Sequence, residues 1–166
     1  SSSILKFYNE KVLHLPDCYQ PNEKHKNIPK NKKSKKDFGL EEDKFIFCSF
    51  NFNYKITPNI FNLWIDILKR TPNSILWILV SNKTAKKNLK FYAESKGLDP
   101  ERIVFAEYLS ESEHLVRLKF ADLFLDTFPY NAHTTASDAI RMGVPIVTIK
   151  GKSFASRVAA SILHQF

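Results

Sequence analysis

The stretch Leu123-Phe-Leu-Asp-Thr-Phe-Pro-Tyr-Asn-Ala-His-Thr-Thr-Ala-Ser-Asp138 predicts a strand, a polar turn and the start of a helix. Residues 123–125 are apolar, as is typical of a buried strand, and a segment with proline and asparagine follows them. Thr134 or Thr135 can cap a helix that ends at Gly143. A strand that leads into a helix through a polar loop is a building unit of α/β folds.

The same stretch predicts an anion site. Backbone N–H groups at a helix start have no partner within the helix, and the helix dipole adds positive potential there. His133, the two threonine hydroxyls and, one turn further, Asp138 lie at this point of the sequence. N–H and hydroxyl donors suit the phosphates of a nucleotide diphosphate, and a carboxylate accepts from ribose hydroxyls. The alternative is a capped helix without a ligand, because capping residues occur at most helix starts.

Apolar segments and helical patterns alternate through the rest of the chain. We expect further strands at residues 44–50, 74–80, 102–105 and 145–149. The helices that separate them are expected at residues 58–70, from Asn82 or Thr84 to Gly97, from Ser110 or Ser112 to Lys119, and at residues 154–163 after a cap at Ser153. This alternation predicts an α/β fold, a Rossmann-like parallel sheet with helices on both faces.

The basic charge lies in one segment of the chain. Seven lysines between Lys24 and Lys36 account for all but one unit of the net charge of +8. Such a run is typical of a solvated loop, and a patch for RNA, acidic protein or anionic lipid is the alternative. We therefore divide the chain into a connector (1–22), a lysine-rich loop (23–43) and a Rossmann-like domain (44–166). No specific binding of nucleic acid is expected from the folded body.

Several classes of protein are excluded by composition. The four glycines cannot form a dinucleotide fingerprint or a P-loop. Cys18 and Cys48 are too far apart in sequence for a CxxC metal site, and reduced thiols fit a cytoplasmic location. No His, Cys or carboxylate cluster has metal-ligand spacing, so no metal and no cofactor is expected. No apolar run is long enough for a membrane span.

Three loops are predicted to meet at one edge of the sheet, because ligands of such folds lie outside the carboxyl ends of the strands. They are residues 51–55, 106–114 and 126–138. Lys55 can place a positive charge on a phosphate there. His114 and Arg117 lie three residues apart and share a helix face, so they can stack on a base and donate to its carbonyl. The alternative for each of these residues is an ordinary surface position.

Several segments resemble the O-GlcNAc transferase family, glycosyltransferase family 41, which includes the SPINDLY-like proteins. They are Cys48-Ser-Phe-Asn-Phe-Asn-Tyr-Lys-Ile-Thr-Pro58, Ile67-Leu-Lys-Arg-Thr-Pro-Asn-Ser-Ile-Leu-Trp77, Leu125-Asp-Thr with His133-Thr-Thr, and Ala155-Ser-Arg-Val-Ala-Ala-Ser161. The resemblance implies the C-terminal, donor-binding half of a GT-B enzyme. Such an enzyme is inverting and metal-independent, and it transfers N-acetylglucosamine from UDP-GlcNAc, or a related UDP-sugar, to Ser or Thr of proteins.

The resemblance also implies a role for each candidate residue. Lys55 is the catalytic residue that neutralises the diphosphate as UDP leaves. His114 stacks on uracil and Arg117 contacts its carbonyl. The phosphates are held by His133, Thr134 and Thr135, and the ribose by Asp138. Phe52 stands where the family usually has Gln or Asn, and we expect Asn51 or Asn53 to compensate. Glu111 stands where the animal enzymes have a lysine.

The resemblance further implies that other parts of the enzyme are needed. The first Rossmann half and the tetratricopeptide repeats, which choose the protein acceptor, have no counterpart in these 166 residues. We expect the chain to be a fragment that binds the donor and is inactive alone. The alternatives are another GT-B transferase, an asparagine-modifying relative, or a non-catalytic module that binds its partner through the lysine run.

Overall fold

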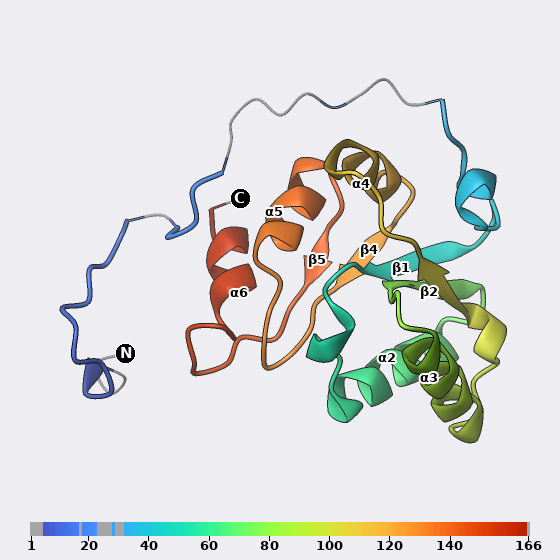
Figure 1. Cartoon of the computed structure of the whole chain (residues 1–166), viewed down its shortest axis with the longest axis horizontal. Helices are drawn as coiled ribbons and strands as arrows, with labels where there is room; N and C mark the ends of the chain where they lie inside the picture. Colours follow the sequence, from blue (N-terminus) through green and yellow to red (C-terminus); the bar gives the residue numbers. More distant parts are fainter. Residues whose placement is uncertain (1–4, 17, 23–27, 29–31, 166) are drawn as a thin grey trace.

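Five strands form one parallel sheet in the order β3-β2-β1-β4-β5 (Figure 1). The computed structural model describes residues 5–16, 18–22, 28 and 32–165. The strands are β1 (Phe45–Ser49), β2 (Ser74–Leu79), β3 (Ile103–Ala106), β4 (Leu123–Leu125) and β5 (Ile146–Val147). This order confirms the predicted Rossmann-like sheet. Its topological switch point lies between β1 and β4, where ligands of such sheets bind.

Helices cover both faces of the sheet, as predicted (Figure 1). The first face carries α2 (Pro58–Arg70) and α3 (Lys83–Ser95), and the second carries α4 (Glu111–Leu118), α5 (Thr134–Arg141) and α6 (Val158–Leu163). Alternate residues of a strand enter opposite cores because successive side chains point to opposite faces. In β2, for example, Leu76 packs toward α2 whereas Trp77 packs toward α4 and α5.

Three helix starts follow local signals in the sequence. The side chains of Thr57, Asn82 and Ser110 accept hydrogen bonds from the backbone N–H of Ile60, Ala85 and Glu113, respectively. Each of these bonds satisfies an N–H group that has no partner within its helix. Thr57 is followed by Pro58 at the first helical position, where a missing N–H costs nothing.

The last helix and the last strand are shorter than predicted. α6 begins at Val158 rather than at residue 154, and Ser153 does not cap it. The hydroxyl of Ser153 lies 2.9 Å from that of Ser156, inside a turn in which the N–H of Gly151 donates to the Ser156 carbonyl at 2.7 Å. These local bonds hold the segment out of the helix. β5 pairs only through Ile146 and Val147.

The lysine-rich segment contributes to the folded domain. Part of the segment at residues 23–43 packs onto the sheet. Residues Lys35–Phe38 form a 3-10 helix, Phe38 packs against Trp77 and Phe120, and Leu40 is buried. These apolar side chains pack the end of the segment against the sheet, although the segment is rich in lysine. The predicted loop at residues 23–27 and 29–31 lies outside the described residues.

Cys18 and Cys48 are free thiols, as expected. Within the described part of the chain, no helix is long and apolar enough to cross a membrane.

Candidate functional site

A cleft of about 480 Å³ lies at the carboxyl ends of β1, β3 and β4. It is lined by eight residues that the sequence analysis assigns to the site, namely Asn51, Lys55, His114, Arg117, His133, Thr134, Thr135 and Asp138. The prediction that three loops meet at one sheet edge is thus confirmed, while the role of each residue stays a prediction. Because β1 and β4 are neighbours, the loops that follow them lie side by side and both line the cleft.

Asp126, directly after β4, organises the loop that leads to α5. Its carboxylate accepts from the N–H groups of Ala132 (2.6 Å) and Thr127 (2.7 Å) and from the Thr148 hydroxyl (2.7 Å). Burial raises the pKa of Asp126, and these hydrogen bonds oppose that rise. The sequence reasoning left this residue out of the site, although a carboxylate just past a buried strand was the available signal.

Asn51 connects the loops after β1 and β4. It is buried, its amide nitrogen donates to the Thr127 hydroxyl at 2.9 Å, and its carbonyl oxygen accepts from the Thr135 hydroxyl at 2.8 Å. Both polar ends therefore bind protein groups, and Asn51 holds Thr135 in place. Asn53 is not among the residues that line the cleft. Asn51 thus lines the cleft with both ends of its amide already paired, whereas Asn53 does not line it.

The start of α5 differs from the prediction. The N-cap is His133, without a capping side-chain bond, and the two threonines occupy the first two helical positions. Thr135 does not cap because it lies inside the helix, at its second position, and its hydroxyl donates to the Asn51 side chain. Among the described residues, the backbone N–H groups of Thr134 and Thr135 have no hydrogen-bond partner. Two N–H donors and the positive end of the helix thus lie at the cleft.

Lys55 supplies a positive charge to the same part of the cleft. Its ammonium donates to the Asn131 carbonyl at 3.1 Å and lies 3.8 Å from the centre of the Tyr130 ring. Burial lowers the pKa of Lys55, and the carboxylate of Asp126 opposes the change. Lys55 is therefore held at a fixed place by a carbonyl and an aromatic face.

The surroundings of His133 favour the neutral form of its imidazole. Burial, and then the charge of Lys55, lower its pKa. Nδ1 lies 2.8 Å from the hydroxyl of Tyr19, while Nε2 is buried without a partner among the described residues.

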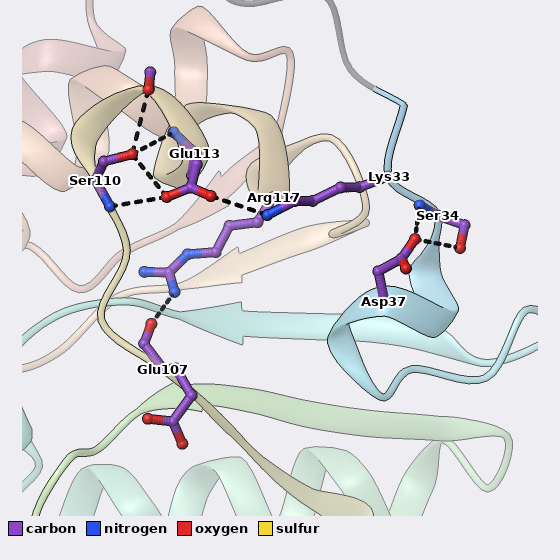
Figure 2. A network of polar contacts seen from close by, with 8 residues as sticks. Lys33, Ser34, Asp37, Glu107, Ser110, Glu113 and Arg117 are labelled. Carbon is purple, nitrogen blue, oxygen red and sulfur yellow. Dashed lines mark hydrogen bonds and ion pairs between the residues drawn. The ribbon is translucent and has the colours of Figure 1, made fainter.

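The pair of His114 and Arg117 forms another part of the lining. Nε of Arg117 donates to Nδ1 of His114 at 2.9 Å. A terminal nitrogen of Arg117 donates to the Glu107 carbonyl at 2.6 Å (Figure 2). Arg117 is only 2% exposed and stacks over Phe50, so it is not a surface residue. Burial lowers the pKa of Arg117 to about 10, which leaves it charged at neutral pH.

Figure 2 shows how the start of α4, the helix that carries this pair, is held. Ser110 and Glu113 form a capping box, and the ammonium of Lys33 lies 3.0 Å from the Glu113 carboxylate. These groups fix the direction of α4 as it leaves the cleft.

Aromatic side chains on the edge of the cleft were not selected from the sequence as ligand contacts. Phe52 and Tyr54 stack with ring centres 5.6 Å apart, and Tyr108 lies against Phe52. All three are exposed. These rings make one part of the cleft lining apolar and aromatic, whereas Lys55 makes another part positively charged. Across the described residues, no three His, Cys, Asp or Glu side chains gather as metal ligands.

Comparison with known proteins identifies the family. The family model "Glycosyl transferase family 41" matches residues 18–166. The chain belongs to this family. A probable UDP-N-acetylglucosamine–peptide N-acetylglucosaminyltransferase SEC of Arabidopsis thaliana is 44% identical over 160 residues. These cover 93% of this chain and 16% of the plant protein. A UDP-N-acetylglucosamine–peptide N-acetylglucosaminyltransferase of Caenorhabditis elegans is 42% identical over 79% of this chain and 11% of its own length.

A solved family structure has the same fold. The K341M mutant of Thermobaculum terrenum O-GlcNAc transferase aligns with a TM-score of 0.71 and 29% identity. The alignment covers 75% of this chain and 24% of that one. The sheet is thus the Rossmann-like fold of a GT-B glycosyltransferase, and the chain spans less than a quarter of each of these relatives.

Proposed function

We propose that this chain binds UDP-GlcNAc, or a related UDP-sugar, as the donor-binding part of an enzyme that transfers GlcNAc to Ser or Thr of proteins. The observation that carries the proposal is the convergence of three loops on one cleft, with a cation and a helix start at one part and a His–Arg pair at another. Homology to peptide N-acetylglucosaminyltransferases supports the choice of donor.

The diphosphate is proposed to lie between Lys55 and the start of α5. The ammonium of Lys55 and the N–H groups of Thr134 and Thr135 are donors for anionic oxygens. The Thr135 hydroxyl already donates to the Asn51 side-chain oxygen, so the backbone N–H of Thr135 is proposed as its contribution. When the bond between the sugar and the diphosphate breaks, negative charge grows on UDP, and these fixed donors stabilise it.

The nucleoside is proposed to lie against α4 and α5. The His114 ring is held by Arg117 through Nδ1 and lines the cleft, and it is assigned to stack on the base. Asp138, one turn into α5, lines the cleft and is assigned to the ribose hydroxyls. The acceptor protein is proposed to bind through regions outside these 166 residues, so that this chain alone binds donor without transferring sugar. We place the enzyme in the cytoplasm because both cysteines are free thiols.

Calorimetry with UDP and UDP-GlcNAc tests the proposal. We expect binding by the unchanged chain, a clear loss in Asp138→Ala, and no change in Asp66→Ala, which removes an exposed carboxylate from α2. Equal binding by Asp138→Ala and the unchanged chain would refute the ribose assignment. Absence of binding by the unchanged chain would refute the donor site, and transfer of sugar to a peptide would refute the expected inactivity. Salt-sensitive RNA binding that UDP does not affect would favour the lysine segment as the functional region.

A further inference from the structure

Tyr19 lies at the start of α5 although it precedes the sheet by more than twenty residues. Its hydroxyl is 2.8 Å from Nδ1 of His133, and its ring packs edge-on against Phe154 with centres 4.8 Å apart. The next residue, Gln20, donates to the Ser137 hydroxyl at 3.4 Å. The segment before the sheet is thus attached to the first turn of α5 at two points.

The contact between Tyr19 and His133 determines where the imidazole proton lies. A neutral imidazole has one N–H donor and one acceptor nitrogen. The hydroxyl of Tyr19 has a second neighbour, the Gln20 side-chain oxygen, but that atom is 3.5 Å away. The shorter contact favours donation from the phenol to Nδ1 over donation to Gln20. In that arrangement His133 carries its proton on Nε2.

Nε2 of His133 is buried and has no partner among the described residues, and the residue lines the cleft. A buried donor without an acceptor lowers stability, so a bound acceptor is the simplest explanation for such a group. The nearby groups are all suited to an anion: the ammonium of Lys55 and the free N–H groups at the start of α5.

We propose that Tyr19 is a positioning residue of the donor site. Its hydroxyl donates to the proton-free Nδ1 of His133 and so directs Nε2–H toward a phosphate oxygen. The inference rests on the proposed function, because it needs a diphosphate in the cleft. It adds a residue from outside the sheet domain to the site, and it assigns His133 a defined tautomer and a defined donor atom.

The tautomer can be observed directly by long-range ¹H–¹⁵N correlation on the ¹⁵N-labelled chain. We expect the Nε2–H pattern for His133, and a mixture of both tautomers in Tyr19→Phe. Addition of UDP should shift the Nε2 proton downfield in the unchanged chain. The Nδ1–H tautomer in the unchanged chain would overturn the inference, whether or not UDP binds.

Affinity measurements test the consequence for binding. We expect Tyr19→Phe to weaken UDP binding roughly threefold to tenfold, the value of one hydrogen bond, with uridine binding unchanged because uridine lacks phosphates. In a His133→Ala background, Tyr19→Phe should have no further effect. Tyr92→Phe is the matched control, since it removes a hydroxyl that donates to Asn62 on the other face of the sheet.

These measurements separate the two proposals. If the unchanged chain binds no UDP, the proposed function fails, and the tautomer still decides whether Tyr19 acts on His133. If UDP binds and Tyr19→Phe behaves like Tyr92→Phe, the inference fails and the proposed function stands.

Discussion

Arg117 donates from Nε to Nδ1 of His114 at 2.9 Å, so the two residues proposed to hold the base are coupled to each other. The guanidinium is also tied to the Glu107 carbonyl and stacked on Phe50. A planar group with several fixed donors can make all three contacts at once, whereas an ammonium cannot.

Arg117→Lys should therefore weaken both the fold and the site. We expect the free energy of unfolding to fall by about 1–3 kcal/mol and UDP to bind about tenfold more weakly. Urea unfolding and calorimetry measure the two effects. Arg70→Lys, the same change at an exposed position at the end of α2, should alter neither. Unchanged UDP affinity in Arg117→Lys would show that the pair does not contact the ligand.

Asp126→Asn should destabilise the fold, because an amide cannot accept all the hydrogen bonds that the carboxylate receives from Ala132, Thr127 and Thr148. We expect a loss of about 2–4 kcal/mol in the free energy of unfolding near neutral pH. Asp66→Asn, on the exposed side of α2, is the matched control.

The pH dependence of this loss follows from the raised pKa of Asp126. Between the ordinary carboxyl pKa and the raised one, the folded state holds more protons than the unfolded state. The contribution of Asp126 to stability is therefore largest below the ordinary pKa and falls as pH rises through the folded-state pKa. We expect the difference between the unchanged chain and Asp126→Asn to be larger at low pH than at pH 7. A difference that grows with pH would contradict the raised pKa.

Lys55→Met should remove the charge that faces the diphosphate. We expect UDP affinity to fall by about tenfold to a hundredfold, as for a partly buried charged hydrogen bond. Because burial lowers the pKa of Lys55, affinity in the unchanged chain should also fall at alkaline pH, below the ordinary lysine range, as the ammonium loses its proton. The variant should lack this alkaline decrease. Lys87→Met, an exposed change on α3, should retain it.

Two substitutions at the start of α4 compare the contributions of a helix cap and of an exposed ion pair to the free energy of unfolding. Ser110→Ala removes the cap and should cost about 1 kcal/mol of unfolding free energy. Lys33→Ala removes the ion pair with Glu113, whose side chains are both over 40% exposed, and should change stability by less than about 0.5 kcal/mol. Thermal unfolding compares them. A larger effect for Lys33→Ala would indicate that the lysine segment holds α4 through more than this pair.

The sequence predicted those parts of the site that depend on local signals or on strand order. Thr57, Asn82 and Ser110 cap helices as expected, and Lys55, His114 and Asp138 reach one cleft because their strands are parallel. The wrong predictions have different physical causes. Thr135 is not a cap because α5 begins one residue before it, and its hydroxyl donates to Asn51, which is far away in sequence. Ser153 bonds within its own turn, and Phe38 carries part of a lysine-rich segment into the core.

The uncapped start of α5 has a consequence for the helix itself. A ligand phosphate bound to the N–H groups of Thr134 and Thr135 would take the place that a serine or an aspartate fills in other helices. The first turn would then be complete only while donor is bound. The exchange rates of these two amide hydrogens with solvent would report occupancy, and release of UDP would expose that turn again.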